Sequence, residues 1–228
     1  MIEAFVFDFS APECLYRARF CAAKQILLGE WIMTQTSRNK KFFTPRVMTR
    51  LAVLGALAFL LTFWEVPLPI FPVFLKLDAS DIPAVIAAIA FGPLGGVVVQ
   101  LIKALLDAYK SSTGGIGQLA NFIAGTAYVV PLGFVYAWRP RLSGFGLGAV
   151  LGTACMVVAA CLANYFLIIP LYGFETVLEL AQKVNSGITD MQTLILLAFA
   201  PFNLLKAGLI SILGYLLYKP LQPLLRRI

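Results

Sequence analysis

The sequence predicts an all-α integral membrane protein with six transmembrane helices and both termini in the cytoplasm. The first observation is composition: 60% of the 228 residues are hydrophobic and only 13% are charged, with a mean hydropathy of +0.87. Soluble domains carry about 25% charged residues. The second is the presence of uncharged runs, such as Leu119–Trp138 and Leu142–Phe174, that are long enough to cross a hydrocarbon core of about 30 Å. A membrane β-barrel would instead show short alternating segments.

The third observation is the position of the basic residues, which sets the number of crossings. Lys and Arg gather at the cytoplasmic ends of membrane helices. Clusters precede the first apolar run, follow the fourth helix and follow the last one. These are Arg38, Lys40, Lys41, Arg46 and Arg50, then Arg139 and Arg141, then Lys219, Arg226 and Arg227. All three clusters lie on one side only if the stretch 81–109 crosses twice, so six helices are expected.

Breaks between the apolar runs place the helix ends. The prolines of "EVPLPIFP" cannot continue the first helix. The Gly92–Pro93 pair is typical of a tight turn followed by the first turn of a new helix. The second helix is then only about 20 Å long, so it is tilted, covered by protein or not fully spanning. The expected helices are about 47–64, 79–91, 93–109, 118–138, 145–172 and 192–218.

The chain divides into three parts by this reading. Residues 1–46 form an N-terminal cytoplasmic segment, 47–218 the transmembrane domain, and 219–228 a basic cytoplasmic tail. Residues 1–32 carry acidic side chains where a signal peptide would be basic, whereas Met33 begins a basic lead-in to the first span. We therefore predict that translation starts at Met33 or that residues 1–32 are disordered, which an intact-mass measurement would test.

Several function classes are disfavoured by the residue types present. The chain has no histidine, so neither His-dependent hydrolysis nor a His-ligated metal site is expected, and no catalytic or metal-binding residue is assigned. The glycine-rich stretch Thr113–Gly117 lacks the Lys-Ser or Lys-Thr of a P-loop. The net charge of +7 comes from basic residues that lie beside the predicted membrane spans. They indicate membrane topology rather than nucleic-acid binding. The chain is predicted not to be an enzyme, and energised transport would need an ATPase from elsewhere.

Polar residues within the last two apolar helices are the candidate binding residues. Lys206 is the only charged residue between Met191 and Tyr218, and a lysine there costs about 2.5–3.5 kcal/mol on insertion scales. Asn203 lies three residues earlier and shares its helix face, while Asn164 lies in the middle of the fifth helix. Unpaired polar groups in hydrocarbon are costly, so each asparagine bonds to a neighbouring helix or to a ligand. For Lys206, a functional role is expected.

Three further features carry structural expectations. Lys103 and Asp107 are four residues apart and are expected to form an ion pair on the helix surface. At least one of the polar residues that precede Pro83 (Asp78, Ser80 and Asp81) is expected to cap the second helix. The first loop, "EVPLPIFPVFLKLDASD", is aromatic and apolar. Such a loop is expected to fold back as a lid over a cavity.

Four blocks of sequence resemble one family in order and spacing across about residues 47–218. They are "FLKLDASDIPAVIAAIAFGPLGGVVVQLIKALL", "TGGIGQLANFIAG", "ANYFLIIPLYG" and "FNLLKAG". The chain resembles the riboflavin-specific substrate-binding subunit, or S component, of energy-coupling factor (ECF) transporters. The resemblance implies a six-helix S-component bundle in the bacterial cell membrane that captures riboflavin from outside. It also implies partners, namely an ECF transmembrane coupling subunit and two ABC ATPases, and it implies no cofactor.

The resemblance also implies particular site residues. The substrate contacts it implies are Asn164, Asn203, Lys206, Phe74, Leu75, Lys76, Leu77 and Asp78. Because riboflavin is uncharged, Lys206 is expected to donate a hydrogen bond to the flavin edge rather than to form half of an ion pair. Ala52 and Ala56 resemble the small-residue face with which the family docks its membrane partner. Gln118 and Ala104 depart from the family pattern, which has Glu and Asn there.

Other functions remain open from the residues themselves. The same architecture could serve another vitamin or a related flavin. A membrane-embedded enzyme is disfavoured by the lack of histidine and of a paired acidic metal motif. A stand-alone facilitator would transport its substrate without ATPase partners.

Overall fold

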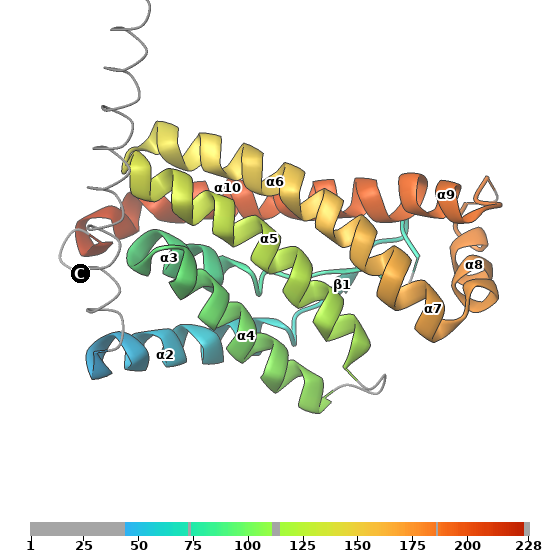
Figure 1. The fold of residues 1–228 in the computed structure, drawn as a ribbon, viewed down its shortest axis with the longest axis horizontal. Coiled ribbons are helices and arrows are strands. Elements are labelled where there is room, and N and C mark those ends of the chain that lie inside the picture. The colour runs from blue at the N-terminus through green and yellow to red at the C-terminus, as the bar shows by residue number, and fades with distance from the viewer. Residues whose placement is uncertain (1–43, 73, 111–114, 186, 226–228) are drawn as a thin grey trace, which may run out of the picture. The chain divides into compact units, whose positions relative to one another are not determined.

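The computed structural model describes residues 44–72, 74–110, 115–185 and 187–225, and there the chain is helical apart from one small hairpin (Figure 1). The expectation for residues 1–32 lies outside these ranges. The elements are α2 (Pro45–Leu61), β1 (Val66–Pro67), β2 (Lys76–Leu77), α3 (Ile82–Phe91), α4 (Pro93–Lys110), α5 (Ile116–Trp138), α6 (Leu142–Ala163), η1 (Asn164–Ile168), α7 (Ile169–Tyr172), α8 (Phe174–Gln182), α9 (Met191–Leu194), η2 (Ile195–Phe199) and α10 (Ala200–Leu225).

The six expected helical segments occur in the expected order. Gly92 has a φ of +86°, a left-handed conformation that glycine adopts readily, and α4 begins at the following Pro93. Among the described residues, three segments are long and apolar enough to cross a membrane: Ile116–Trp138, Leu142–Tyr172 and Met191–Tyr218. Ile82–Phe91 is a shorter apolar helix. The structure is therefore a mostly helical one with membrane-capable segments.

Glycine permits close approach between neighbouring helices. α5 and α6 run side by side in Figure 1, and they are in contact. A Cβ atom at Gly152 of α6 would lie 2.7 Å from the carbonyl oxygen of Tyr128 on α5. A Cβ atom at Gly55 of α2 would lie 2.6 Å from Cγ2 of Ile102 on α4. These positions admit no side chain without movement of a helix.

Two short π-helical turns interrupt the fifth and sixth helical segments. η1 joins α6 to α7, and η2 joins α9 to α10, and the two turns contact each other. A π turn inserts an extra residue into the helical repeat, and such turns are frequent at functional sites. Asn164 is the first residue of η1, and Asn203 lies four residues beyond Phe199, the last residue of η2. Asn164 therefore lies in one π turn, and Asn203 lies about one helical turn beyond the other.

The first loop forms a two-stranded hairpin that packs on the last helical segment. Val66 pairs with Leu77 across the antiparallel strands. The ring of Phe71 contacts that of Phe202 edge to face at a centroid distance of 5.4 Å. Phe74 lies 5.9 Å from Phe199 by the same measure. Phe71, Leu75 and Leu77 of the loop are thus buried in an apolar cluster with residues of η2 and α10.

Helix α8 was not expected from the sequence, which assigned its residues to a loop between the last two helices. Gly173, with a φ of +83°, separates it from α7. The buried residues of α8, Val177 and Ala181, join the apolar cluster formed by the first loop and η2. One face is apolar and the other carries Glu175 and Glu179, so α8 is an amphipathic helix that covers this end of the bundle.

Candidate functional site

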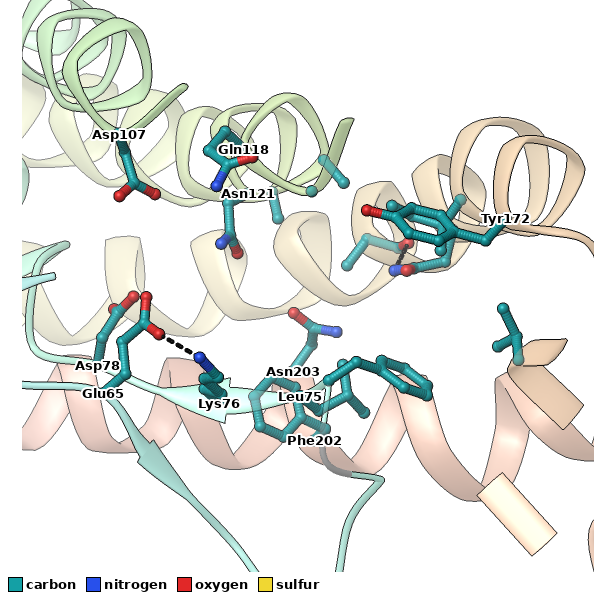
Figure 2. Close-up of a pocket in the computed structure, with 18 of the residues that line it drawn as sticks. Glu65, Leu75, Lys76, Asp78, Asp107, Gln118, Asn121, Tyr172, Phe202 and Asn203 are labelled. Carbon is teal, nitrogen blue, oxygen red and sulfur yellow. Dashed lines mark hydrogen bonds and ion pairs between the residues drawn. The ribbon is translucent and has the colours of Figure 1, made fainter. Parts of the chain in front are cut away.

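A cavity of about 480 Å³ lies beneath the first loop. Its walls come from the hairpin, from the facing ends of α4 and α5, from the η1–α8 region and from α10. Figure 2 shows Asn121 of α5 and Asn203 of α10 reaching into it from opposite walls, with Tyr172 at one end. Cavities of this size commonly hold small-molecule ligands.

Asn164 and Asn203 are oriented by their own helices. Nδ2 of Asn164 donates a hydrogen bond to the carbonyl oxygen of Ala160 at 2.7 Å. Nδ2 of Asn203 donates to the carbonyl oxygen of Phe199 at 2.8 Å. A primary amide has two N–H donors and one acceptor oxygen, so this bond leaves each side chain with both donor and acceptor capacity. Since both residues line the cavity, that capacity is available to a ligand.

The opposite wall is more polar than the sequence suggested. Gln118 and Asn121 project from the first turns of α5, and Asp107 and Lys110 from the last turn of α4. Oε1 of Gln118 is buried and has no hydrogen-bond partner among the described residues. An unpaired buried acceptor is costly. This wall is therefore suited to a ligand that brings hydroxyl or amide donors.

An ion pair within the loop lies at one side of the cavity. Nζ of Lys76 lies 2.8 Å from Oε2 of Glu65 (Figure 2), and both residues line the cavity. On α4, Asp107 pairs with Lys110 at 3.2 Å. The charged groups at this edge are thus matched with opposite charges.

Lys206 is half of an ion pair, contrary to the expectation from the sequence. Its Nζ lies 3.4 Å from Oδ1 of Asp78 and 3.3 Å from Oδ2 of Asp81. Lys206 is only 2% exposed, and a buried ammonium group needs a countercharge. Two carboxylates from the segment before α3 supply it. The contact with Asp78 is an ion pair and not a hydrogen bond, because Oδ1 of Asp78 has no hydrogen-bond partner among the described residues.

Two other expectations near this segment are wrong. Lys103 pairs with Asp81 and not with Asp107, because α4 packs against the start of α3 and turns Lys103 inward. Asp81 is the residue that precedes α3, but its side chain makes no capping bond. Its Oδ1 instead accepts hydrogen bonds from Lys103 and from Nε2 of Gln100, the latter at 2.8 Å.

The structure gathers most of the predicted contact residues at one site. Those that line the cavity are Asn164, Asn203, Phe74, Leu75, Lys76 and Asp78. Leu77 is buried in the apolar cluster under the loop, and Lys206 lies behind Asp78 rather than at the cavity wall. Ala52 and Ala56 are exposed on α2, while Gly55 between them faces α4.

Sequence reasoning missed several cavity residues, notably Asn121, Asp107 and Lys110. Asn121 follows Gln118 by three residues at the start of an apolar helix, so the two amides share a face. That pairing is a signal the sequence contains. The spacing of Asp107 from Lys103 predicts a surface ion pair instead, and the sequence predicts no role for Lys110.

Membrane-capable helices around a cavity lined by both apolar and polar side chains are typical of a membrane protein that binds a small molecule. A family profile described as "ECF transporter, substrate-specific component" matches residues 46–218. The chain belongs to this family, whose members are substrate-binding components of transporters and not enzymes.

Individual relatives agree with this assignment. The chain is 34% identical over 191 residues to the riboflavin transporter RibU of Staphylococcus aureus (strain TCH60), covering 84% of this chain and 95% of that one. It is 33% identical over 175 residues to the riboflavin transporter FmnP of Bacillus subtilis (strain 168), covering 75% and 90%. A solved structure of the S component of a bacterial ECF transporter superposes with a TM-score of 0.63 at 32% identity, covering 84% of this chain and 98% of that one.

Proposed function

We propose that this protein is the riboflavin-binding S component of an ECF transporter, which captures riboflavin from outside the cell and delivers it inward with an energy-coupling module. The observation that carries the proposal is the pair of asparagines, Asn164 and Asn203, held by their own helices at the wall of a cavity of about 480 Å³. Relatives named riboflavin transporters share 33–34% identity with the chain.

The chemistry of the cavity suits the flavin ring. The pyrimidine edge of riboflavin alternates carbonyl acceptors with an N–H donor. A primary amide offers both complements, so Asn164 and Asn203 are the proposed edge contacts. Phe74 and Phe202 line the same cavity and supply the apolar, aromatic surface that a fused ring system requires.

The polar wall suits the ribityl chain. Its hydroxyl groups are donors as well as acceptors, and Gln118 presents a buried acceptor without a partner among the described residues. Asn121 and Asp107 line the same wall. The flavin ring is therefore proposed to lie toward α10 and the loop, with the ribityl chain toward α4 and α5.

The remaining residues of the predicted set are assigned as follows. Phe74, Leu75, Lys76 and Asp78 are proposed to contact riboflavin from the loop, because they line the cavity. Leu77 and Lys206 are proposed to act without contacting riboflavin. Leu77 anchors strand β2 in the apolar cluster, and Lys206 holds Asp78 in place.

The proposal includes the membrane topology. Six crossings with both termini in the cytoplasm place the basic clusters inside and the first loop outside, in a multi-pass protein of the bacterial cell membrane. α3 contains ten residues, about 15 Å of helix, so it would complete its crossing together with the segment that precedes it.

The proposed partners are an ECF transmembrane coupling subunit and two ABC ATPases. The exposed Ala52 and Ala56 on α2 are the proposed docking face. Small residues permit close helix contacts in a membrane, and both alanines are exposed rather than packed against the other described helices.

Uptake of labelled riboflavin tests the proposed function. The chain is expressed in a bacterium that lacks riboflavin uptake, with and without an ECF coupling module. Uptake that requires both the chain and a hydrolysis-competent module is expected. Uptake without any module would identify a facilitator, and uptake of a different vitamin would show that the substrate is wrong.

A further inference from the structure

Four charged side chains meet beside the cavity in a buried, charge-balanced group. They are Asp78, Asp81, Lys103 and Lys206, and they are exposed by only 7%, 2%, 4% and 2%. The carboxylates precede α3, whereas the lysines come from α4 and α10. Two anions and two cations at one place satisfy the requirement that buried charges be paired.

The group has an order that leads from α4 to the cavity. Lys103 contacts Oδ1 of Asp81 and lies 3.2 Å from Oγ of Ser80. Lys206 contacts the other oxygen, Oδ2, at 3.3 Å and reaches Asp78 at 3.4 Å. Of the four charged residues, only Asp78 lines the cavity. The contacts therefore form a series that ends with Asp78 at the cavity wall, and Lys103 is the charged residue at the other end of the series.

Removal of Lys103 would change the charge that the cavity presents. Asp81 would keep only Lys206 as a cation, and Coulomb attraction in a buried site is strong. Lys206 would be drawn toward Asp81, and Asp78, at the cavity wall, would lose its countercharge. The acceptor that Asp78 offers to a ligand would then change in position or in protonation.

We propose that Lys103 is a positioning residue for the substrate site, acting through Asp81 and Lys206 to hold Asp78 at the cavity wall. Lys103 does not line the cavity, so it acts without touching the substrate. The proposal rests on the proposed function only in the choice of riboflavin as the binding probe.

A double-mutant cycle between Lys103 and Asp78 tests the proposal. The variants are Lys103→Met, Asp78→Asn and the two together, and the Kd for riboflavin is measured by quenching of its fluorescence. Lys103→Met alone is expected to raise Kd about tenfold, a coupling within the range seen for residues in one salt-bridge network. In the Asp78→Asn background the same change is expected to alter Kd by less than about twofold. Equal losses in both backgrounds would overturn the proposal.

Three matched variants separate positioning from general loss of structure. Lys103→Arg retains the cation and is expected to keep Kd within about threefold. Lys103→Met with Asp81→Asn removes one charge of each sign, leaves Lys206 for Asp78, and is expected to restore binding; continued tenfold loss would contradict the proposal. Tyr128→Phe removes a partly buried hydrogen bond of 2.8 Å to Ser211, outside the cavity, and is expected to lower the melting temperature without changing Kd.

A ligand-free measurement separates this proposal from the proposed function. Thermal unfolding without riboflavin is measured for the unchanged protein, Lys103→Met, Asp78→Asn and the double variant. The effects of the two changes are expected to be non-additive, although Lys103 pairs with Asp81 and not with Asp78. Additive effects would overturn the role of Lys103 whatever the substrate is. Absence of riboflavin binding by the unchanged protein would instead overturn the proposed function.

Discussion

Oδ1 of Asp78 lies 3.4 Å from Nζ of Lys206, and this contact joins the loop over the cavity to the last helical segment. Asp78 lines the cavity, whereas Lys206 lies behind it. The cost of placing a lysine in an apolar helix is therefore offset by two carboxylates of the same chain, Asp78 and Asp81. A ligand is not needed as the countercharge.

Loss of Lys206 is expected to destabilise the ligand-free protein. Lys206→Met leaves Asp78 buried without a cation, and breaking a buried ion pair costs about 3–5 kcal/mol. Lys206→Met with Asp78→Asn is expected to recover part of this loss, because Asp81 retains Lys103. Thermal unfolding in detergent measures both. A melting temperature unchanged by Lys206→Met would show that the ion pair contributes nothing to stability.

The two cavity asparagines are expected to carry binding energy. Asn164→Ala and Asn203→Ala each remove an amide at the cavity wall that has a donor and an acceptor to spare. Each change should weaken riboflavin binding by about 1–3 kcal/mol, the cost of leaving a buried hydrogen-bonding group unpaired. Calorimetry is the measurement, and Asn185→Ala, at an exposed residue outside the cavity, is the control. Unchanged affinity for both cavity variants would remove them from the site.

The ring contact between Phe71 and Phe202 is expected to govern release. Phe71→Ala removes the edge-to-face contact and leaves a void under the loop, so the loop should open more often. Riboflavin is expected to dissociate about tenfold faster, with a smaller change in the association rate. Stopped-flow fluorescence gives both rates. Ile70→Ala, at a residue of the same loop that is 79% exposed, should leave both unchanged; an equal effect there would argue against a specific role for Phe71.

A bulky side chain at Ala56 is expected to separate binding from transport. Ala56 is exposed on α2, so Ala56→Trp should spare riboflavin affinity but reduce module-dependent uptake at least about tenfold, since tryptophan prevents a close helix contact. Val150→Trp, at an exposed residue of α6, is the matched control. If uptake is normal for Ala56→Trp, the docking face lies elsewhere.

The helical framework could be predicted because its signals are local. Each apolar run, and a break such as Gly92–Pro93, lies in one short stretch of sequence, so six helical segments follow directly. Asn164 and Asn203 were found for the same reason, since an amide within an apolar run is conspicuous.

The partners of Lys206 could not be predicted because they depend on packing between distant segments. Asp78 and Asp81 lie before α3, where their type and position are equally typical of helix capping. Lys103 and Asp107 have the spacing of a surface ion pair, and only the packing of α4 against α3 decides against it. The π turns η1 and η2 have no sequence pattern to mark them. α8 was not predicted because the polar residues along one of its faces are equally typical of a loop.

The central claim is that the cavity beneath the first loop binds riboflavin, and titration of the purified, ligand-free protein with riboflavin tests it most directly. We predict about one riboflavin bound per chain with a Kd below about 1 µM, and the visible absorption bands of a flavin in protein purified without added ligand. Absence of saturable riboflavin binding, with tight binding of another vitamin in the same assay, would contradict it.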